Sequence, residues 1–192
     1  IQREIARLLA SGVASGATGG SSGGAASAFG ADEIRASWLE SLGSLSQAKG
    51  VILGVPSDSG AGIRRGAAYG PRALREQMLK DAAFRGWISN REWVDIGDIL
   101  VNPHFLHDEM LNPEQIARSQ RAMFPDSPLP LQSRLPVSPL SLVKWVLERI
   151  LAVHPHLRVF VIGGDHSVAW PVSEVLAKRW PTTLGIVQPD AH

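Results

Sequence analysis

The sequence contains no cysteine, and its charges almost cancel. Without cysteine there can be no disulfide bond, no thiolate zinc site and no cysteine nucleophile. The 19 lysines and arginines face 18 aspartates and glutamates, which gives a formal net charge of +1. This balance gives no reason to expect nucleic acid or an anionic membrane surface as a partner. Absence of cysteine fits a reducing compartment, and we expect a cytoplasmic protein.

Long hydrophobic runs are also missing. No apolar stretch approaches the roughly 18 residues of a membrane span, so we expect no membrane segment. The sequence still has 44% hydrophobic residues, enough to bury a real core, and its 192 residues suffice for one domain. It begins with Ile1 rather than methionine, which leaves the true N-terminus open.

Composition divides the chain into two regions. Residues 1–31 are dominated from Ser11 onward by glycine, alanine and serine, which predicts a flexible N-terminal segment. Residues 32–192 alternate short apolar runs with helical patterns and predict the folded domain. The runs of strand length are Gly50–Val55, Trp93–Ile96, Arg158–Ile162 and Leu184–Val187.

Helical patterns lie between these strands. Asp32 suits the N-cap of a first helix, and Pro71 suits the first turn of a second. The clearest apolar stripe follows Ser138, as N-cap, and Pro139. We expect the second helix to point three residues inward: Leu74, Met78 and Leu79. Repeated strand–helix–strand units predict an α/β fold, a three-layer α-β-α arrangement around a mainly parallel sheet.

Two of the predicted strands are followed by a carboxylate and a histidine. One leads to Asp165 and His166, and the next leads to Asp190 and His192. Because the carboxyl ends of parallel strands share one edge of the sheet, His166, Asp190 and His192 could converge there. Imidazole and carboxylate donors without a thiol suit Mn, Fe, Co or Zn. A purely structural histidine is the alternative interpretation.

These segments carry a family resemblance. The box Gly163–Ser167 followed by Asp190–His192 resembles the Gly-Gly-Asp-His-Ser and Asp-Ala-His-x-Asp motifs of the ureohydrolases, which include arginase, agmatinase and formimidoylglutamase. Two earlier segments agree in order, Gly54–Arg75 and Asp95–Asp98. The resemblance covers roughly residues 50 to 192 and implies an arginase-like fold, incomplete because the sequence stops inside the second motif.

The resemblance also implies a chemistry. Ureohydrolases use two Mn²⁺ ions and a bridging hydroxide to attack the carbon of a guanidine or amidine. His166, Asp190 and His192 match metal ligands, and Asp165 matches a residue that orients a ligand or its loop. The family's remaining ligands and proton shuttle would lie beyond His192, so we expect this chain alone to be inactive. The motifs favour an agmatinase-like or formimidoylglutamase-like substrate and a homo-oligomer when complete.

Other interpretations stay open for single residues. Asp95 and Asp98 could form an acid–base pair, but we favour carboxylates that hold loops by accepting backbone N–H groups. His104 and His107 suggest metal ligands, but a solvated loop is the simpler interpretation. The glycines of residues 60–66 miss the dinucleotide fingerprint by one position.

Two further functional classes compete with the hydrolase. A metal-dependent deacylase of the same general fold would share the Asp-x-His pair but not the Gly-Gly-Asp-His-Ser box. A non-catalytic remnant would keep the scaffold without the complete set of ligands.

Overall fold

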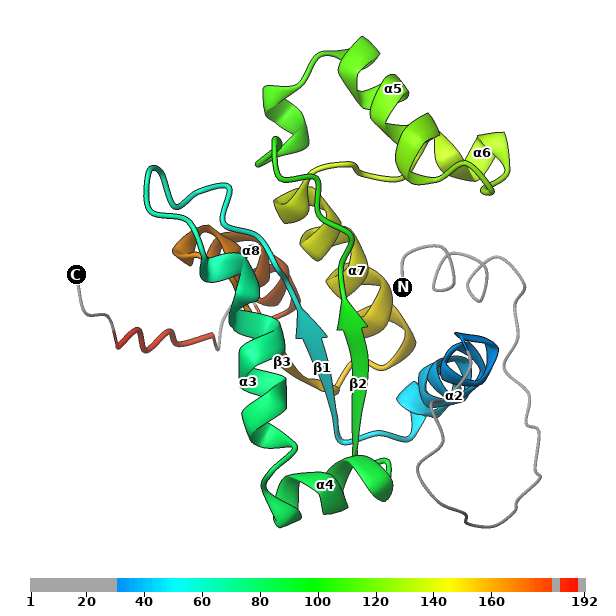
Figure 1. Cartoon of the computed structure of the whole chain (residues 1–192), viewed down its shortest axis with the longest axis vertical. Coiled ribbons are helices and arrows are strands. Elements are labelled where there is room, and N and C mark those ends of the chain that lie inside the picture. The colour runs from blue at the N-terminus through cyan, green and yellow to red at the C-terminus, as the bar shows by residue number, and fades with distance from the viewer. Residues whose placement is uncertain (1–30, 181–183, 190–192) are drawn as a thin grey trace.

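The structure, a computed structural model, describes residues 31–180 and 184–189 (Figure 1). Its centre is a parallel sheet with strand order β2-β1-β3. The strands are β1 (Gly50–Gly54), β2 (Trp93–Asp98) and β3 (Arg158–Ile162). All three coincide with predicted strands. The predicted N-terminal segment, up to residue 30, and the predicted ligands Asp190 and His192 lie outside the described residues.

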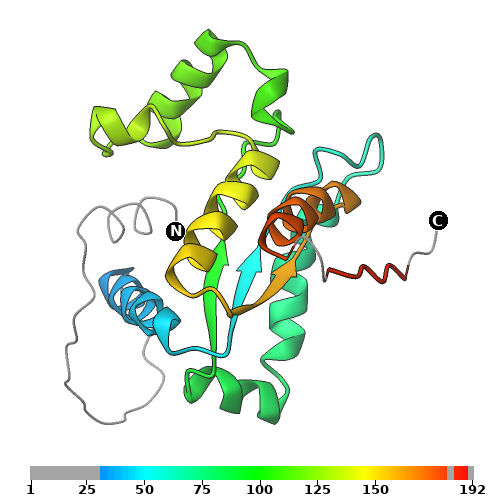
Figure 2. The same cartoon turned by 180° about the vertical axis from the view of Figure 1, so that it is seen from behind.

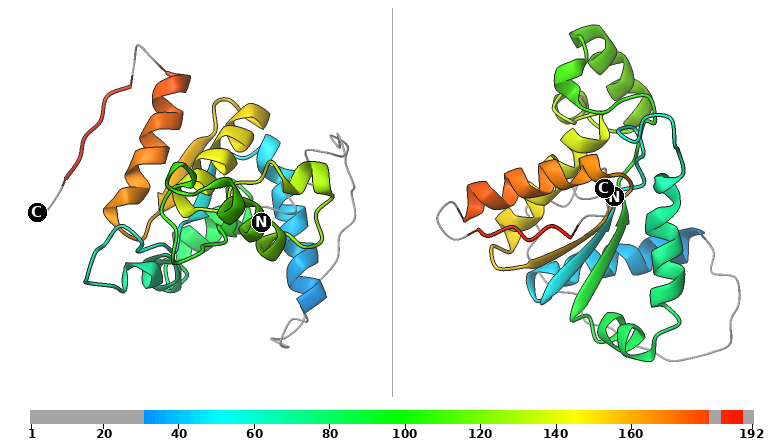
Figure 3. Two further views of the ribbon diagram at one scale, coloured as in Figure 1. Left: turned by 90° about the horizontal axis from the view of Figure 1, so that it is seen from above. Right: turned by 90° about the vertical axis from the view of Figure 1, so that its left-hand side faces the viewer.

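Helices cover both faces of this sheet, so the predicted three-layer α/β fold is confirmed. Figure 2 shows α7 (Pro139–Val153) and α8 (Ala169–Arg179) in front of one face. Helix α2 (Ala31–Gly43) lies to the side of the sheet in this view and packs on the same core through Trp38 and Leu42. The opposite face carries α3 (Gly70–Met78) and α4 (Ala82–Ser89), and the edge-on view in Figure 3 separates the layers. Beyond the sheet lie α5 (Pro113–Met123) and α6 (Leu129–Gln132). Short 3₁₀ turns complete the path: η1 (Ser44–Ser46), η2 (Ala67–Tyr69), η3 (Asp108–Met110) and η4 (His166–Val168).

Strand β1 is buried along its whole length. A central parallel strand needs apolar residues on both sides because helices cover both faces. Val51 and Leu53 point into the larger core with α7, whereas Ile52 belongs to a smaller cluster with Phe84 of α4. This double burial explains why the sequence shows a continuous apolar run rather than alternation.

Helix α7 supplies most of the larger core. Eight of its residues are buried: Pro139, Leu140, Leu142, Val143, Val146, Leu147, Ile150 and Leu151. Ser138 occupies the predicted N-cap position, but its side chain makes no capping bond. The carboxylate of Asp108 instead accepts the backbone N–H groups of Val137 and Ser138, the latter at 2.8 Å. A residue 30 positions away therefore completes this helix start.

An ion-pair network joins α7 to α8. The Glu174 carboxylate lies 2.6 Å from the Lys144 ammonium of α7 and 2.8 Å from Lys178 of its own helix. Hydrogen bonds from Lys144 and Lys178 lower the pKa of Glu174 to about 2. The two helices are thus held together by charge at their solvent side and by apolar packing beneath it.

Three predictions about this fold are wrong. Leu184–Val187 forms no strand, and Val187 is 91% exposed. An apolar run predicts burial, but a strand also needs a neighbour whose backbone groups pair with it. Leu74 and Leu79 of the α3 region are substantially exposed rather than inward, whereas Met78 packs on the smaller cluster.

No helix within residues 31–180 and 184–189 is long and apolar enough to cross a membrane.

Candidate functional site

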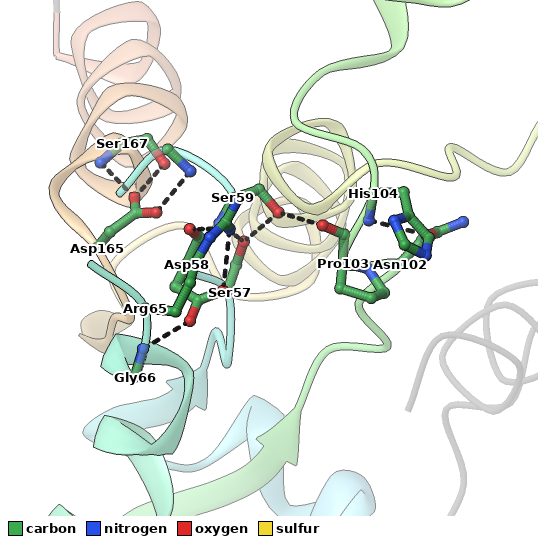
Figure 4. Close-up of polar contacts among 11 residues, drawn as sticks. Ser57, Asp58, Ser59, Arg65, Gly66, Asn102, Pro103, His104, Asp165 and Ser167 are labelled. Atoms are coloured by element: carbon green, nitrogen blue, oxygen red, sulfur yellow. Dashed lines mark hydrogen bonds and ion pairs between the residues drawn. The ribbon is translucent and has the colours of Figure 1, made fainter. Parts of the chain in front are cut away.

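The loops that follow β1, β2 and β3 are hydrogen-bonded to one another at the carboxyl edge of the sheet (Figure 4). The loop after β3 bonds to the loop after β1 through Asp165 and Gly60, whose N–H lies 2.7 Å from the carboxylate. The loop after β1 bonds to the loop after β2 through Ser59, whose hydroxyl donates to the Pro103 carbonyl at 3.3 Å. The edge predicted to carry the site is therefore one connected surface.

Asp165 organises the turn that contains His166. It is the N-cap of η4, and one carboxylate oxygen accepts both the backbone N–H of Ser167, at 2.9 Å, and the Ser167 hydroxyl. The other oxygen accepts the N–H of Gly60. Both oxygens of this carboxylate accept hydrogen bonds from the protein, so Asp165 acts as a structural acceptor at this position. The N-cap of η4 is therefore Asp165, and Ser167 supplies the capped N–H group.

His166 is exposed at the start of η4, directly after the carboxyl end of β3. Its Nε2 atom lies 3.3 Å from the side-chain nitrogen of Gln188. Gln188 precedes Asp190 by two residues in the sequence. The structure thus brings the chain leading to the second predicted ligand pair alongside the first predicted ligand.

The predicted metal ligands fall partly inside and partly outside the described residues. Within residues 31–180 and 184–189, no three histidine, aspartate or glutamate side chains are grouped closely enough to hold a metal ion. His166 is the only one of the three predicted ligands that falls in this part of the chain, since Asp190 and His192 lie outside it. The three predicted ligands are two imidazoles and one carboxylate, and these ligand types suit divalent Mn, Fe, Co or Zn.

Asp95 and Asp98 hold the end of β2 in place. Arg75 of α3 donates two hydrogen bonds to Asp95, at 2.7 and 2.9 Å, and a third to Asp98. Asp95 also accepts the backbone N–H of Gly97, which has a positive φ of 78°. Burial alone would lower the pKa of the Arg75 guanidinium, but the hydrogen bonds to Asp95 and Asp98 outweigh it and raise the pKa. The interpretation of these aspartates as loop-holding residues is confirmed for Asp95.

Asp58 holds the loop after β1 closed on itself. Its carboxylate accepts the N–H of Gly66 at 2.9 Å and pairs with Arg65 at 3.3 Å. The hydrogen bond from Gly66, with the smaller contribution of Arg65, lowers the pKa of Asp58. Positive φ angles at Gly62 and Gly66 are conformations that glycine adopts without steric cost. The glycines of this segment therefore serve a tight loop.

The histidines after β2 differ from each other. His104 is exposed, as expected for a solvated loop. His107 is partly buried and stacks on Trp170 of α8, with ring centroids 5.4 Å apart. Its Nδ1 atom also accepts the backbone N–H of Glu109 and caps η3. The solvated-loop interpretation is wrong for His107, because a ring 63 positions later in the chain covers it.

Sequence reasoning missed the residues that join these loops. Ser57, Ser59 and Pro103 carry no chemical motif, and their contacts arise from backbone carbonyls and short hydroxyls. Arg75 was visible only as part of a family segment. An arginine in the predicted helix that precedes the Asp-x-Gly-Asp element was the sequence signal for this ion-pair cluster.

The chain is similar in sequence to several known proteins. An agmatinase of Bacillus cereus is 23% identical over 159 residues, which cover 81% of this chain and 43% of that protein. A guanidinopropionase of Pseudomonas aeruginosa is 29% identical over 146 residues, 73% of this chain and 35% of that protein. The mitochondrial guanidino acid hydrolase of Homo sapiens is 26% identical over 146 residues, 73% of this chain and 32% of that protein. The chain thus spans about two fifths or less of the length of these relatives.

The family model of the arginase family matches residues 48–192, three quarters of the sequence. The match includes all three strands of the sheet and all the loops at its carboxyl edge. It agrees with the resemblance of the Gly-Gly-Asp-His-Ser box, and the parallel sheet between helical layers is the expected scaffold. This chain belongs to the arginase family.

Proposed function

We propose that this chain forms part of a metal-dependent hydrolase that cleaves a C–N bond of a guanidino or amidino compound. The observation that carries the proposal is the position of His166 at the carboxyl edge of the sheet, with Gln188 beside its Nε2 atom. Asp190 follows Gln188 by two residues, and two residues of chain span at most about 7 Å. The described chain that leads toward the other two predicted ligands, Asp190 and His192, therefore passes beside His166.

The metal in this proposal is Mn²⁺, held on this chain by His166, Asp190 and His192. Their donors are two imidazoles and a carboxylate, the kinds of ligand that Mn²⁺ shares with other first-row divalent metals. When bound, such ions lower the pKa of a coordinated water so that hydroxide is available at neutral pH. The contribution of the chain is positional, since Asp165 fixes the turn that presents His166.

The substrate in this proposal is a small linear guanidine or amidine. Support comes from the relatives, whose names include agmatinase, guanidinopropionase and guanidino acid hydrolase. Agmatine and formimidoylglutamate remain the two substrates favoured by the motifs. They differ in the charge of the tail, cationic in the first and anionic in the second, so a direct comparison of the two separates the specificities. We further propose a cytoplasmic homo-oligomer.

The test is hydrolysis with and without metal. The assay uses the longer hydrolase of which this chain would form part, loaded with Mn²⁺, because the chain alone is expected to be inactive. It measures urea release from agmatine, guanidinopropionate and arginine, and formamide release from formimidoylglutamate. We expect turnover of at least one compound and its loss after removal of metal by a chelator. Chelator treatment that leaves the rate unchanged would contradict the proposal. Turnover only of an acetylated amine would indicate the deacylase instead.

A matched pair of variants assigns the metal to His166. His166→Ala removes the predicted ligand, and His104→Ala removes an exposed imidazole from the neighbouring loop. Loss of an outer-shell partner typically costs about 10- to 100-fold in metal affinity. We expect His166→Ala to reduce metal affinity by more than this and to lower the number of Mn²⁺ ions bound per chain. One of the two metal sites should lose more occupancy than the other. His104→Ala should leave both quantities unchanged.

A further inference from the structure

The turn that carries His166 is anchored on the loop after β1, far from it in sequence. The backbone N–H of Asp165 donates to the Ser57 carbonyl at 2.9 Å. In return the Gly60 N–H donates to the Asp165 carboxylate at 2.7 Å, across 105 positions of sequence. The same carboxylate accepts the N–H of Ser167 on the other side of His166. His166 therefore lies in the sequence between Asp165 and Ser167, which are both fixed through one carboxylate. Figure 4 shows these contacts of Asp165 and Ser167.

Two glycines allow this close approach. A Cβ atom added to Gly164 would lie 1.7 Å from the Ser57 carbonyl oxygen, and one added to Gly60 would lie 2.9 Å from Cβ and Oγ of Ser167. Neither glycine has a positive φ, so both are required by packing and not by backbone conformation. The two loops fit against each other with no room for a methyl group.

The loop after β1 is itself fixed on its other sides. Asp58 holds Gly66 and Arg65, and the Ser59 hydroxyl donates to Pro103 of the loop after β2. Ser57 is 1% exposed. A loop held at these points is a firm support, so a change at Gly60 must be absorbed by the turn that contains His166.

We propose that Gly60 is a positioning residue for His166 and acts through the Asp165 carboxylate. The inference rests on the proposed metal role of His166 for its functional meaning, but its geometry does not. The Gly60 N–H fixes one oxygen of Asp165, the second oxygen fixes Ser167, and the imidazole between them is held with its Nε2 atom beside Gln188. The loop after β1 thereby sets the direction of a ligand carried by β3.

Two variants break this arrangement from opposite sides. Asp165→Asn keeps the size of the side chain but replaces one oxygen by an NH₂ group. Whichever way the amide turns, a donor faces the N–H of either Gly60 or Ser167, so one hydrogen bond is lost. Gly60→Ala keeps the N–H but pushes its methyl group against Ser167. Gly86→Ala in α4 is the matched control, because a Cβ there meets nothing within 4 Å.

The experiment follows the His166 imidazole by NMR in the full chain. Its resonance is assigned with His166→Gln and then titrated with Mn²⁺, which broadens nearby signals. We expect Asp165→Asn and Gly60→Ala to shift the metal-free resonance and to raise the Mn²⁺ concentration for half-broadening by about 10-fold or more. Gly86→Ala should change neither. Ser167→Gly removes the side chain that a methyl group at Gly60 would meet. Added to Gly60→Ala, it should therefore restore part of the resonance position and part of the Mn²⁺ affinity, with Ser167→Gly alone as the reference.

The outcomes separate this inference from the proposed function. If the wild-type resonance is not broadened by Mn²⁺, the proposed metal role fails, and the shift of the metal-free resonance still decides the positioning role. A folded Gly60→Ala protein with the wild-type His166 resonance would overturn the inference. Unfolding of both variants would also overturn it, because the contacts would then hold the whole fold rather than His166.

Discussion

Replacing Arg75 by alanine tests the ion-pair cluster at the end of β2. The Arg75 guanidinium is 18% exposed and donates to both Asp95 and Asp98. Asp98 lies so close to β1 that a Cβ on Gly54 would overlap its carboxylate oxygen at 1.7 Å. In Arg75→Ala, two carboxylates would therefore stay near each other without a cation, at the junction of β1, β2 and α3.

The cost follows from the burial of the cluster. Breaking a fully buried ion pair costs about 3–5 kcal/mol, because the partner is left charged and unpaired. Here Asp95 is 24% and Asp98 38% exposed, so water recovers part of that cost. We expect a loss of about 2–3 kcal/mol in the free energy of unfolding. For a chain of this size, that lowers Tm by about 5–10 °C.

The assay compares two arginines of one helix. Arg72 also lies on α3, but its pair with Glu76 is largely exposed. An exposed pair of this spacing contributes about 0.3–0.5 kcal/mol, so Arg72→Ala should be nearly neutral. Urea unfolding followed by circular dichroism measures both variants. Equal losses for Arg72→Ala and Arg75→Ala, or a loss below about 1 kcal/mol for Arg75→Ala, would refute the reasoning.

The remaining predictions concern α8 and the glycine contacts. The pKa of Glu174 is about 2 in the folded chain against a usual value of 4.5, so its contribution to stability is present above about pH 4.5 and is lost as pH falls toward 2. Glu174→Gln should therefore flatten the acid limb of a plot of Tm against pH, and an unchanged limb would contradict this. Gly164→Ala should cost about 3 kcal/mol or more, because its methyl group meets the backbone of Ser57. Gly86→Ala should cost nothing measurable in the same unfolding experiment.

Hydrophobic patterns in the sequence predicted the scaffold because apolar residues in these elements are the buried ones. The continuous run of β1 and the stripe of α7 correspond to surfaces covered on one or both sides, and both elements formed as expected. The same signal failed at Leu184–Val187, whose apolar character is as strong. Ile186 and Val187 are exposed, so apolar character secured neither burial nor pairing in this segment. Both depend on which neighbour is available.

The candidate site divides in the same way. The box at Gly163–Ser167 identified His166 as the candidate ligand and Asp165 as the residue that orients its turn, and the structure shows which groups Asp165 holds. No sequence pattern indicated Gly60 as its partner. The contact spans 105 positions and uses a backbone N–H that every residue except proline possesses.

By itself, the sequence determined the family, the three strands, the clearest helix and the order of the candidate ligands, because motif spacing and hydrophobic periodicity are written along the chain. Only the tertiary structure decided what lies against what. It placed His107 beneath Trp170, Arg75 between two aspartates and Gly60 against the turn of His166. Such contacts depend on how loops that are distant in the sequence approach each other in space. The local sequence around a residue does not show which distant residue it will bond to or pack against.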